Sequence, residues 1–338
     1  MMVSMALRRA IWPLKEPFRI SRGTQSTFAA LQVELRDSSG HIGRGEALGI
    51  ISDGETPESM MLDLEGIRSE IEAGADRVAL ARILPAGGAR CAVDCAMWDL
   101  EAQQTGVSVL QRCQLEVFET IECAQTISIA PLSELPAKIR PFADYPLLKI
   151  KLDASHPLEA LQTVNQIAPN ARLIVDPNQS WSPEILFALV DKFESLNVAL
   201  IEQPLAKHEE DALAGYDGPV PLCADESFTD TASLINLVGK YQVANIKLDK
   251  CGGLTEALSA HRFIAEAGLR VMVGCMGGSS LAMAPAALLA GSAAFVDLDG
   301  PLLQASDYPV RIRYESGRMH FPPPDLWGWP RSAEKAVH

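Results

Sequence analysis

Basic residues are scarce in this chain of 338 residues, which contains 29 Lys and Arg against 43 Asp and Glu. The formal net charge is -14, and no stretch of the chain concentrates Lys or Arg. Nucleic-acid backbones and anionic membrane surfaces are bound by clusters of basic residues. We therefore expect neither a nucleic acid nor a membrane as a partner.

Long apolar runs are also missing. The longest, Leu281 to Val296, is interrupted by Pro285 and Gly291 and is shorter than the roughly 20 residues of a membrane-spanning helix. We expect it to form a buried helix. Two arginines occur in the first ten residues, but the apolar stretch of a signal peptide does not follow them. These absences predict a cytoplasmic location.

Paired cysteine motifs are absent too. The seven cysteines are odd in number and form no Cys-x-x-Cys pair. Cys91 and Cys95 are four residues apart in an Ala-rich segment, a spacing that places both on one face of a helix. Reduced and mostly buried thiols are the preferred interpretation.

The first third of the chain has the pattern of a small α+β domain. Alternating residues around Phe28 to Leu35, a turn, and a short run from Ile42 to Ala47 predict an antiparallel sheet. Apolar spacing predicts helices around Pro57 to Ala73 and from Gly88 to Gln104.

From about Thr120 the pattern changes to short β-branched runs, each followed by a longer helical segment, which is typical of parallel βα units. Eight such runs occur, enough to close a barrel: Ala124 to Ile129, Leu147 to Leu152, Leu173 to Val175, Val198 to Ile201, Pro221 to Ala224, Val243 to Leu248, Val271 to Val273 and Ala294 to Leu298. Their ends recur every 22 to 27 residues. This regularity predicts a (β/α) barrel, whose chemistry lies at the carboxyl ends of the strands.

Three consecutive predicted strands end in a carboxylate. Asp176, Glu202 and Asp225 lie in Val-Asp-Pro-Asn, Ile-Glu-Gln-Pro and Ala-Asp-Glu-Ser, and should converge at the barrel mouth, where they need a cation. No His or Cys recurs at these strand ends, and an all-oxygen site suits a hard ion such as Mg²⁺, with Mn²⁺ as second choice. The alternative is that each acid caps the following helix, which would explain one such residue better than three.

Lysines end two further strands. Lys149 and Lys151 lie two residues apart in Leu-Leu-Lys-Ile-Lys-Leu-Asp, so a strand points both to one face, and Lys247 ends the strand four positions further round. A lysine acts as a base near neutral pH only if its pKa is lowered, which burial, a neighbouring ammonium and a cation would promote. A Schiff-base lysine is the competing interpretation, although that chemistry needs no metal. Strand alternation places Lys250 on the opposite face, outside the site.

The motifs Lys-Ile-Lys, Val-Asp-Pro-Asn, Ile-Glu-Gln-Pro, Ala-Asp-Glu-Ser and Ile-Lys-Leu-Asp-Lys-Cys-Gly-Gly, in this order and spacing, resemble the muconate-lactonising subgroup of the enolase superfamily. The resemblance covers essentially the whole chain, including Ala-Val-Asp-Cys-Ala-Met-Trp-Asp-Leu. It implies a (β/α)7β barrel with an α+β capping domain. We expect the cap at residues 1–115, the barrel at 116–310, and at 311–338 a C-terminal segment that packs back on the cap.

Asp297-Leu298-Asp299 is similar to the Asp-x-Asp signature of the dipeptide epimerases in this subgroup, where the pair binds the substrate's amino terminus; turn-forming acids are the alternative. The resemblance implies an isomerase of peptidoglycan peptide metabolism. It would invert the C-terminal residue of a dipeptide such as L-Ala-L-Glu by two-base 1,1-proton transfer through an enediolate. Mg²⁺ on the three carboxylates would stabilise the enediolate, Lys151 and Lys247 would act as base and acid on opposite faces, and Lys149 would add positive charge.

Two further residues are candidates for substrate binding, Arg22 and Thr126. Arg22 could pair with an acidic side chain of the substrate, or be a solvated loop residue, and Gln25 could line the same pocket without a charge. N-acylamino acid racemase, o-succinylbenzoate synthase and muconate cycloisomerase activities would reuse the lysines and the metal, but their substrates lack the free ammonium that Asp297 and Asp299 would bind. A non-catalytic binding barrel is a remote alternative. The sequence allows a homo-oligomer and leaves the preferred dipeptide open.

Overall fold

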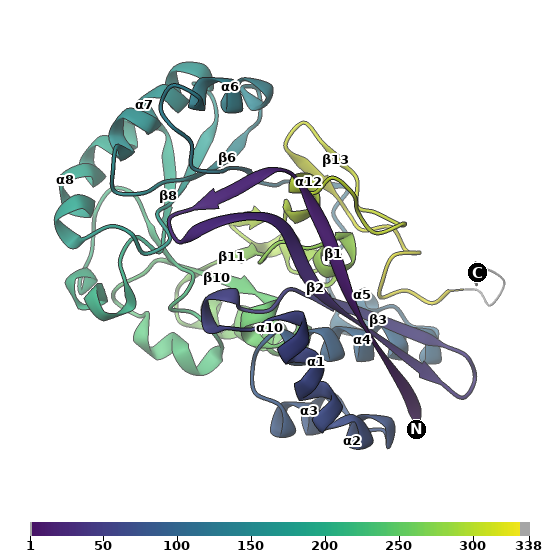
Figure 1. Ribbon diagram of the computed structural model, residues 1–338. Helices are drawn as coiled ribbons and strands as arrows, with labels where there is room; N and C mark the ends of the chain where they lie inside the picture. The colour runs from purple at the N-terminus through teal and green to yellow at the C-terminus, as the bar shows by residue number, and fades with distance from the viewer. Residues whose placement is uncertain (1, 332–338) are drawn as a thin grey trace.

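The structure, a computed structural model, describes residues 2–331 and consists of an N-terminal cap of strands and helices beside a barrel (Figure 1). The strands of the cap form one antiparallel sheet in the order β1-β2-β3. The elements of the cap are β1 (Val3–Ile20), β2 (Gly23–Asp37), β3 (Ile42–Ala47), η1 (Ile51–Asp53), α1 (Pro57–Gly66), α2 (Arg68–Glu72), α3 (Arg77–Ile83), α4 (Gly88–Thr105) and α5 (Val109–Cys113).

Helix α4 lies directly on strand β3. A Cβ atom at Gly43 would meet Ala96 O at 2.1 Å, and one at Gly45 would meet Ala92 O at 2.0 Å. The two alternate glycines therefore let the helix backbone approach the strand more closely than any side chain would allow. This contact fixes the sheet of the cap against its longest helix.

The predicted helix from Pro57 to Ala73 is instead two helices, α1 and α2. Thr56 caps α1 in a reciprocal capping box with Ser59. The helical path stops at Ile67, whose φ of -118° and ψ of 16° follow Gly66. Glycine is a poor helix former, so the single-helix prediction is wrong at this point.

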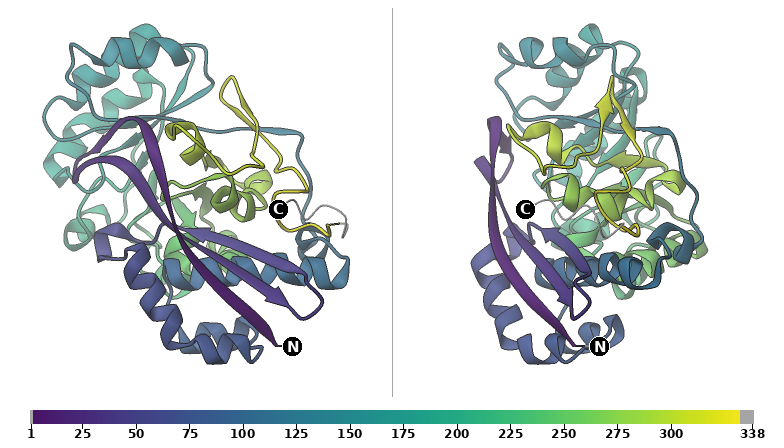
Figure 2. Two further views of the ribbon diagram at one scale, coloured as in Figure 1. Left: turned by 45° about the vertical axis from the view of Figure 1, so that its right-hand side comes forward. Right: turned by 90° about the vertical axis from the view of Figure 1, so that its right-hand side faces the viewer.

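Strand β1 was not predicted from the sequence. It pairs with β2 from Val3 opposite Asp37 to Ile20 opposite Gly23, so the two strands form a hairpin with the turn at residues 21–22. Figures 1 and 2 show this hairpin reaching from the cap across the barrel. The cap therefore supplies a cover for the barrel at the tip of a long hairpin.

Eight parallel strands form the barrel, as predicted, in the order β5 to β12. Between the first and last strands, Ala124 N donates to Val296 O at 2.8 Å. The strands are β5 (Gln125–Ile127), β6 (Leu147–Lys151), β7 (Arg172–Asp176), β8 (Val198–Glu202), β9 (Leu222–Ala224), β10 (Val243–Lys247), β11 (Arg270–Gly274) and β12 (Phe295–Asp297). A small third sheet has the order β13-β14-β4 and consists of β4 (Thr120–Glu122), β13 (Tyr314–Glu315) and β14 (Arg318–His320).

Helical segments connect the barrel strands, but not all of them are α-helices. After β8 and β9 the connections are 3₁₀ segments, η4 and η5. The helical segments are α6 (Leu135–Ile139), η2 (Arg140–Phe142), α7 (Pro157–Ile167), α8 (Pro183–Phe193), η3 (Glu194–Leu196), η4 (Lys207–Leu213), η5 (Thr231–Asn236), α9 (Leu248–Cys251), α10 (Leu254–Glu266), α11 (Ser280–Ala287), η6 (Ala290–Ser292) and α12 (Gly300–Leu303). The apolar run from Leu281 therefore starts as a buried helix but ends in strand β12, which corrects the prediction of one helix.

The C-terminal segment contacts the cap. Trp327 Nε1 donates to Arg44 O at 2.9 Å and to Cys95 O at 3.1 Å. Arg331 forms an ion pair of 2.7 Å with buried Asp99 of α4. Within residues 2–331 no helix is long and apolar enough to cross a bilayer.

Candidate active site

The inside of the barrel is built in layers, because every second residue of a strand points inward. The lowest layer, here called the apolar layer, is a buried cluster with one residue from each strand position: Ala124, Leu147, Ile174, Leu200, Cys223, Val243, Met272 and Phe295. Two residues further along each strand lies the mouth layer: Thr126, Lys149, Asp176, Glu202, Asp225, Asn245, Gly274 and Asp297. An apolar floor thus carries a ring of mostly polar and charged side chains.

Within the mouth layer the three predicted metal-binding carboxylates converge on lysines. Lys149 Nζ lies 3.1 Å from Asp176 Oδ2 and 2.7 Å from Glu202 Oε2. Lys247 Nζ lies 2.6 Å from Asp225 Oδ2 and 4.0 Å from Glu202 Oε1. All five side chains are buried. Residues that are up to about 100 positions apart in the chain therefore share one charged cluster.

The charges of this cluster shift one another's pKa values. Burial and the neighbouring Asp176 raise the pKa of Glu202 to about 7. The pKa of Asp176 is about 2, because Lys151 and Lys149 outweigh the effect of burial. Burial disfavours the charge of Lys247, but Asp225 and Glu202 hold its pKa above the usual range. Here the carboxylates expected to bind the cation pair with Lys247 instead, and its pKa is raised and not lowered.

The same carboxylates were predicted to hold a metal ion. Among the described residues, no three His, Cys, Asp or Glu side chains stand close enough together to hold one as they are, because lysine ammonium groups lie between the carboxylates. The donors are nevertheless all oxygens, and the buried Glu202 Oε2 has an ion-pair partner but no hydrogen-bond donor of suitable geometry. Such a set fits a hard divalent cation once the ammonium groups move aside.

Lys151 and Lys247 stand at the ends of β6 and β10, with β7, β8 and β9 between them in the sheet. Lys151 Nζ contacts Asp176 Oδ2 at 2.5 Å and Asn178 Oδ1 at 3.1 Å. Four strands of separation in a barrel of eight place the two lysines on opposite sides of the mouth. Both line one cavity of about 720 Å³.

Asp297 and Asp299 lie in the same cavity, next to Thr126. Asp297 Oδ2 accepts from Lys149 Nζ at 2.7 Å, and its Oδ1 is 3.5 Å from Thr126 Oγ1. Asp299 Oδ2 accepts from the backbone N–H of Thr126 at 2.6 Å. Burial and the charge of Asp297 raise the pKa of Asp299 to about 7. The structure thus brings together all three predicted residues of this side of the site.

Lys250 was wrongly left out of the site. Strand β10 ends at Lys247 and the chain turns into helix α9, so strand alternation no longer applies. Lys250 Nζ lies 2.7 Å from Asp225 Oδ1, and the residue lines the cavity. Asn178, which follows β7, was also missed, since its contact with Lys151 depends on the path of the loop.

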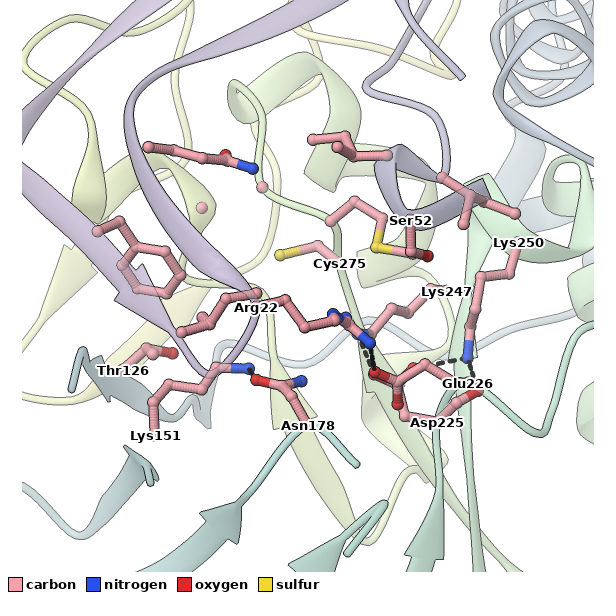
Figure 3. Close-up of a pocket in the computed structure, with 18 of the residues that line it drawn as sticks. Arg22, Ser52, Thr126, Lys151, Asn178, Asp225, Glu226, Lys247, Lys250 and Cys275 are labelled. Atoms are coloured by element: carbon pink, nitrogen blue, oxygen red, sulfur yellow. Dashed lines mark hydrogen bonds and ion pairs between the residues drawn. The ribbon is translucent and has the colours of Figure 1, made fainter. Parts of the chain in front are cut away.

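Arg22 comes from the cap, in the turn of the β1–β2 hairpin, and reaches across the mouth. Its Nη1 lies 2.6 Å from Glu226 Oε1, directly after β9 (Figure 3). The neighbouring Ser21 Oγ donates to Asn178 O at 3.2 Å. The hairpin tip therefore contacts the barrel after both β7 and β9.

A second part of the cap, the loop formed by residues 48–53, also closes on the mouth. Asp249 of α9 accepts the backbone N–H groups of Leu48 and Gly49, both at 2.8 Å. Residues 49–53 line the cavity. A buried side chain of the barrel thus determines where this loop of the cap lies.

Two family models match the chain. Residues 2–112 match the N-terminal domain of mandelate racemase and muconate lactonizing enzyme, and residues 137–328 match the enolase C-terminal domain-like family. The L-Ala-D/L-Glu epimerase of Escherichia coli is 38% identical over 311 residues, which cover 91% of this chain and 97% of that protein. The N-acetyl-D-glutamate racemase of a Pseudoalteromonas species is 43% identical over 256 residues, or 76% of this chain and 81% of that protein.

Solved structures agree with these matches. An enolase family member from Agrobacterium tumefaciens, described as having homology to dipeptide epimerases, was crystallised with sodium and L-Ala-L-Glu. It is 38% identical to this chain and superposes with a TM-score of 0.93, covering 96% of this chain and 100% of its own.

Proposed function

Because the chain belongs to the mandelate racemase and muconate lactonizing enzyme family of the enolase superfamily, we propose that it is a dipeptide epimerase, an isomerase that inverts the α-carbon of the C-terminal residue. One observation carries the proposal. Lys151 and Lys247 face one cavity from opposite sides, with two further carboxylates, Asp297 and Asp299, at its edge. This arrangement provides a proton donor and acceptor on each face of a planar intermediate.

In the proposed reaction one lysine removes the α-proton and the other returns a proton to the opposite face. The acceptor must be neutral and the donor an ammonium, so the two exchange protonation states during each turnover. Lys151 and Lys247 each take both roles, depending on which epimer is bound. Lys149, which is buried and contacts Glu202 and Asp297, stays cationic and contributes positive charge near the substrate carboxylate.

We propose that Asp176, Glu202 and Asp225 hold Mg²⁺, with Mn²⁺ as a substitute. Relatives support this choice, since a dipeptide epimerase from Methylococcus capsulatus was crystallised with Mg and L-Arg-D-Lys. The bound ion would neutralise the three carboxylates in place of the lysines and supply positive charge to the substrate carboxylate. The lysines would then be free to turn toward the α-carbon.

Asp297 and Asp299 bind the substrate's free ammonium in this proposal. Asp297 Oδ1 accepts only a long hydrogen bond, of 3.5 Å, from Thr126 Oγ1. Asp299 Oδ2 accepts a short one, of 2.6 Å, from the backbone N–H of Thr126. Burial and the charge of Asp297 raise the pKa of Asp299, and an ammonium between the two acids would offset that charge. Thr126 acts through Asp299, whose side chain it orients.

The two similar curated relatives suggest the residue that is inverted. An L-Ala-D/L-Glu epimerase and an N-acetyl-D-glutamate racemase both act on a glutamate whose nitrogen is in an amide bond. We propose L-Ala-L-Glu or a similar acidic dipeptide as substrate, with Arg22 as the partner of the acidic side chain. The family resemblance also favours a cytoplasmic role in the metabolism of peptidoglycan peptides.

N-acetylglutamate racemisation is the second candidate, since the relative with that activity is 43% identical. The two candidate substrates differ in the free amine on the acyl group. Asp297 and Asp299 favour the dipeptide, because its ammonium can donate charge-assisted hydrogen bonds to both buried acids, whereas an acetyl group offers no donor.

The test is deuterium incorporation at the α-carbon in D₂O. The purified protein with Mg²⁺ is incubated with L-Ala-L-Glu, L-Ala-L-Gln, N-propionyl-L-Glu and N-acetyl-L-Glu, and products are followed by mass spectrometry. We expect exchange with epimerisation of L-Ala-L-Glu above all, and its loss after metal removal by EDTA, restored by Mg²⁺ or Mn²⁺. Faster turnover of the two acylated glutamates would select the second candidate, and inactivity toward all four would contradict both.

A further inference from the structure

The ion pair between Arg22 and Glu226 joins a long, exposed side chain to a largely buried one. Arg22 sits in the two-residue turn of a hairpin, and 39% of its side chain is exposed. The side chain of Glu226 is only 10% exposed. A long arginine side chain loses rotamer entropy when it is held in one position. Whatever holds it before the substrate arrives therefore reduces the entropic cost of binding.

The backbone around Glu226 is fixed by a buried side chain. Gln203 Oε1 accepts the backbone N–H of Asp225 at 2.9 Å and that of Ser227 at 3.1 Å, one on each side of Glu226. Gln203 is in turn fixed by Nε2, which donates to Glu210 Oε1 at 2.7 Å and to Tyr241 OH at 3.1 Å. Hydrogen bonds of a buried side chain therefore hold the backbone on both sides of Glu226 in place.

The guanidinium of Arg22 uses one of its five N–H donors in this pair. Only Nη1 contacts Glu226, and no other partner of this guanidinium is found within residues 2–331. Arg22 and Glu226 both line the cavity, and Figure 3 shows the arginine extended across it. The remaining donors are therefore available to a second carboxylate, and a planar fork can bind one on another edge.

We propose that Glu226 is a specificity-determining residue, which positions the guanidinium of Arg22 so that its remaining donors select a substrate with a carboxylate side chain. This inference rests on the proposed dipeptide epimerase activity and deepens it. Glu226 acts through Arg22 and is a positioning residue, not a catalytic one.

A positioning role for Glu226 predicts a change in the preference for anionic substrates that is opposite to the change expected from charge alone. Replacing Glu226 by Gln makes the cavity more positive, which alone would favour an anionic substrate. If Glu226 positions Arg22, the same replacement instead weakens the preference for the anion. Asp53, another acid that lines the cavity and whose carboxylate accepts from Ser52 Oγ at 3.1 Å, serves as the matched charge control.

The experiment compares kcat/KM for L-Ala-L-Glu with that for L-Ala-L-Gln in the parent protein and in Glu226→Gln, Arg22→Met, the double variant and Asp53→Asn. We expect the Glu/Gln ratio to fall about tenfold in Glu226→Gln, the order expected when one charge-assisted hydrogen bond is weakened, and mainly through KM for L-Ala-L-Glu. In the Arg22→Met background Glu226→Gln should change the ratio no further. Asp53→Asn should leave the ratio unchanged or raise it.

Other results would overturn the inference. A higher Glu/Gln ratio in Glu226→Gln would mean that Glu226 competes with the substrate for Arg22. Equal losses on both substrates, or a full effect of Glu226→Gln in the Arg22→Met background, would mean that Glu226 acts through Asp225 or Lys247. A parent protein that epimerises no dipeptide would remove the proposed function and the inference together, whereas an active parent with an unchanged ratio would remove the inference alone.

Discussion

Replacing Asp297 by Asn tests which substrate the cavity is built for. The change keeps the shape of the side chain, and of the three carboxylates that contact Lys149 here it alters Asp297 alone. What is lost is one of two anionic partners of the proposed substrate ammonium. A hydrogen bond to a charged group contributes about 1.5–3 kcal/mol, so kcat/KM for L-Ala-L-Glu should fall by about 10- to 150-fold.

The control substrate is N-propionyl-L-Glu, which has the same shape as L-Ala-L-Glu without the amine. Its turnover by Asp297→Asn should fall much less than that of the dipeptide, because it never used the lost charge. Both rates are read by α-deuteration in D₂O under identical conditions. Equal losses for the two substrates would refute the reasoning, because they would show that Asp297 matters through its 2.7 Å contact with Lys149 and not through the ammonium.

Three further predictions follow from the geometry. Lys151→Ala and Lys247→Ala should each lower the rate of epimerisation by about 10²-fold or more, while each variant retains α-exchange of one epimer only. Exchange of both epimers by a single variant would contradict a two-base reaction. Gly45→Ala should cost about 3 kcal/mol or more of unfolding free energy in urea titrations, since its Cβ would meet backbone at 2.0 Å, whereas Gly66→Ala, with nothing within 4 Å, should be neutral or stabilising. Hydrogen bonds from the β2–β3 turn and from Gln104 of α4 outweigh burial and lower the pKa of Asp37 from 3.8 to about 2. The contribution of Asp37 to stability should therefore be present above about pH 4 and lost as the pH falls toward about 2. Melting temperatures of Asp37→Ala and the parent should converge over that range, and a constant difference would contradict this.

The barrel and most of its charged residues could be predicted from the sequence because parallel βα units impose a regular spacing. Once a strand end is located, alternation decides which side chains face inward, and Asp176, Glu202 and Lys149 follow from that rule alone. The same rule failed for Lys250, because β10 stops at Lys247 and the next residues are helical. Alternation predicts the direction of a side chain only up to the strand end, and here the helix begins at the next residue.

The hairpin and its contacts were beyond this reasoning. Most residues of β1 are exposed or half-buried, so the strand shows no apolar alternation to detect. Arg22 could be named as a candidate from its chemistry, but its partner Glu226 lies 204 residues away and on a different domain. Pairings of this kind depend on how two folded units meet, and that is decided by packing over the whole molecule.

The contact between Asp249 and the loop at residues 48–53 has a consequence for the order in which the molecule is made. Leu48 and Asp249 are 201 positions apart, and at synthesis rates of about 5–20 residues per second roughly 10 to 40 s separate their emergence from the ribosome. During that interval the nascent cap can assemble its sheet and helices, but its loop has no anchor. The cap loop that lines the active-site cavity can therefore reach its final position only late, after the tenth strand of the chain has been synthesised. A nascent chain that ends before this point has no complete active site.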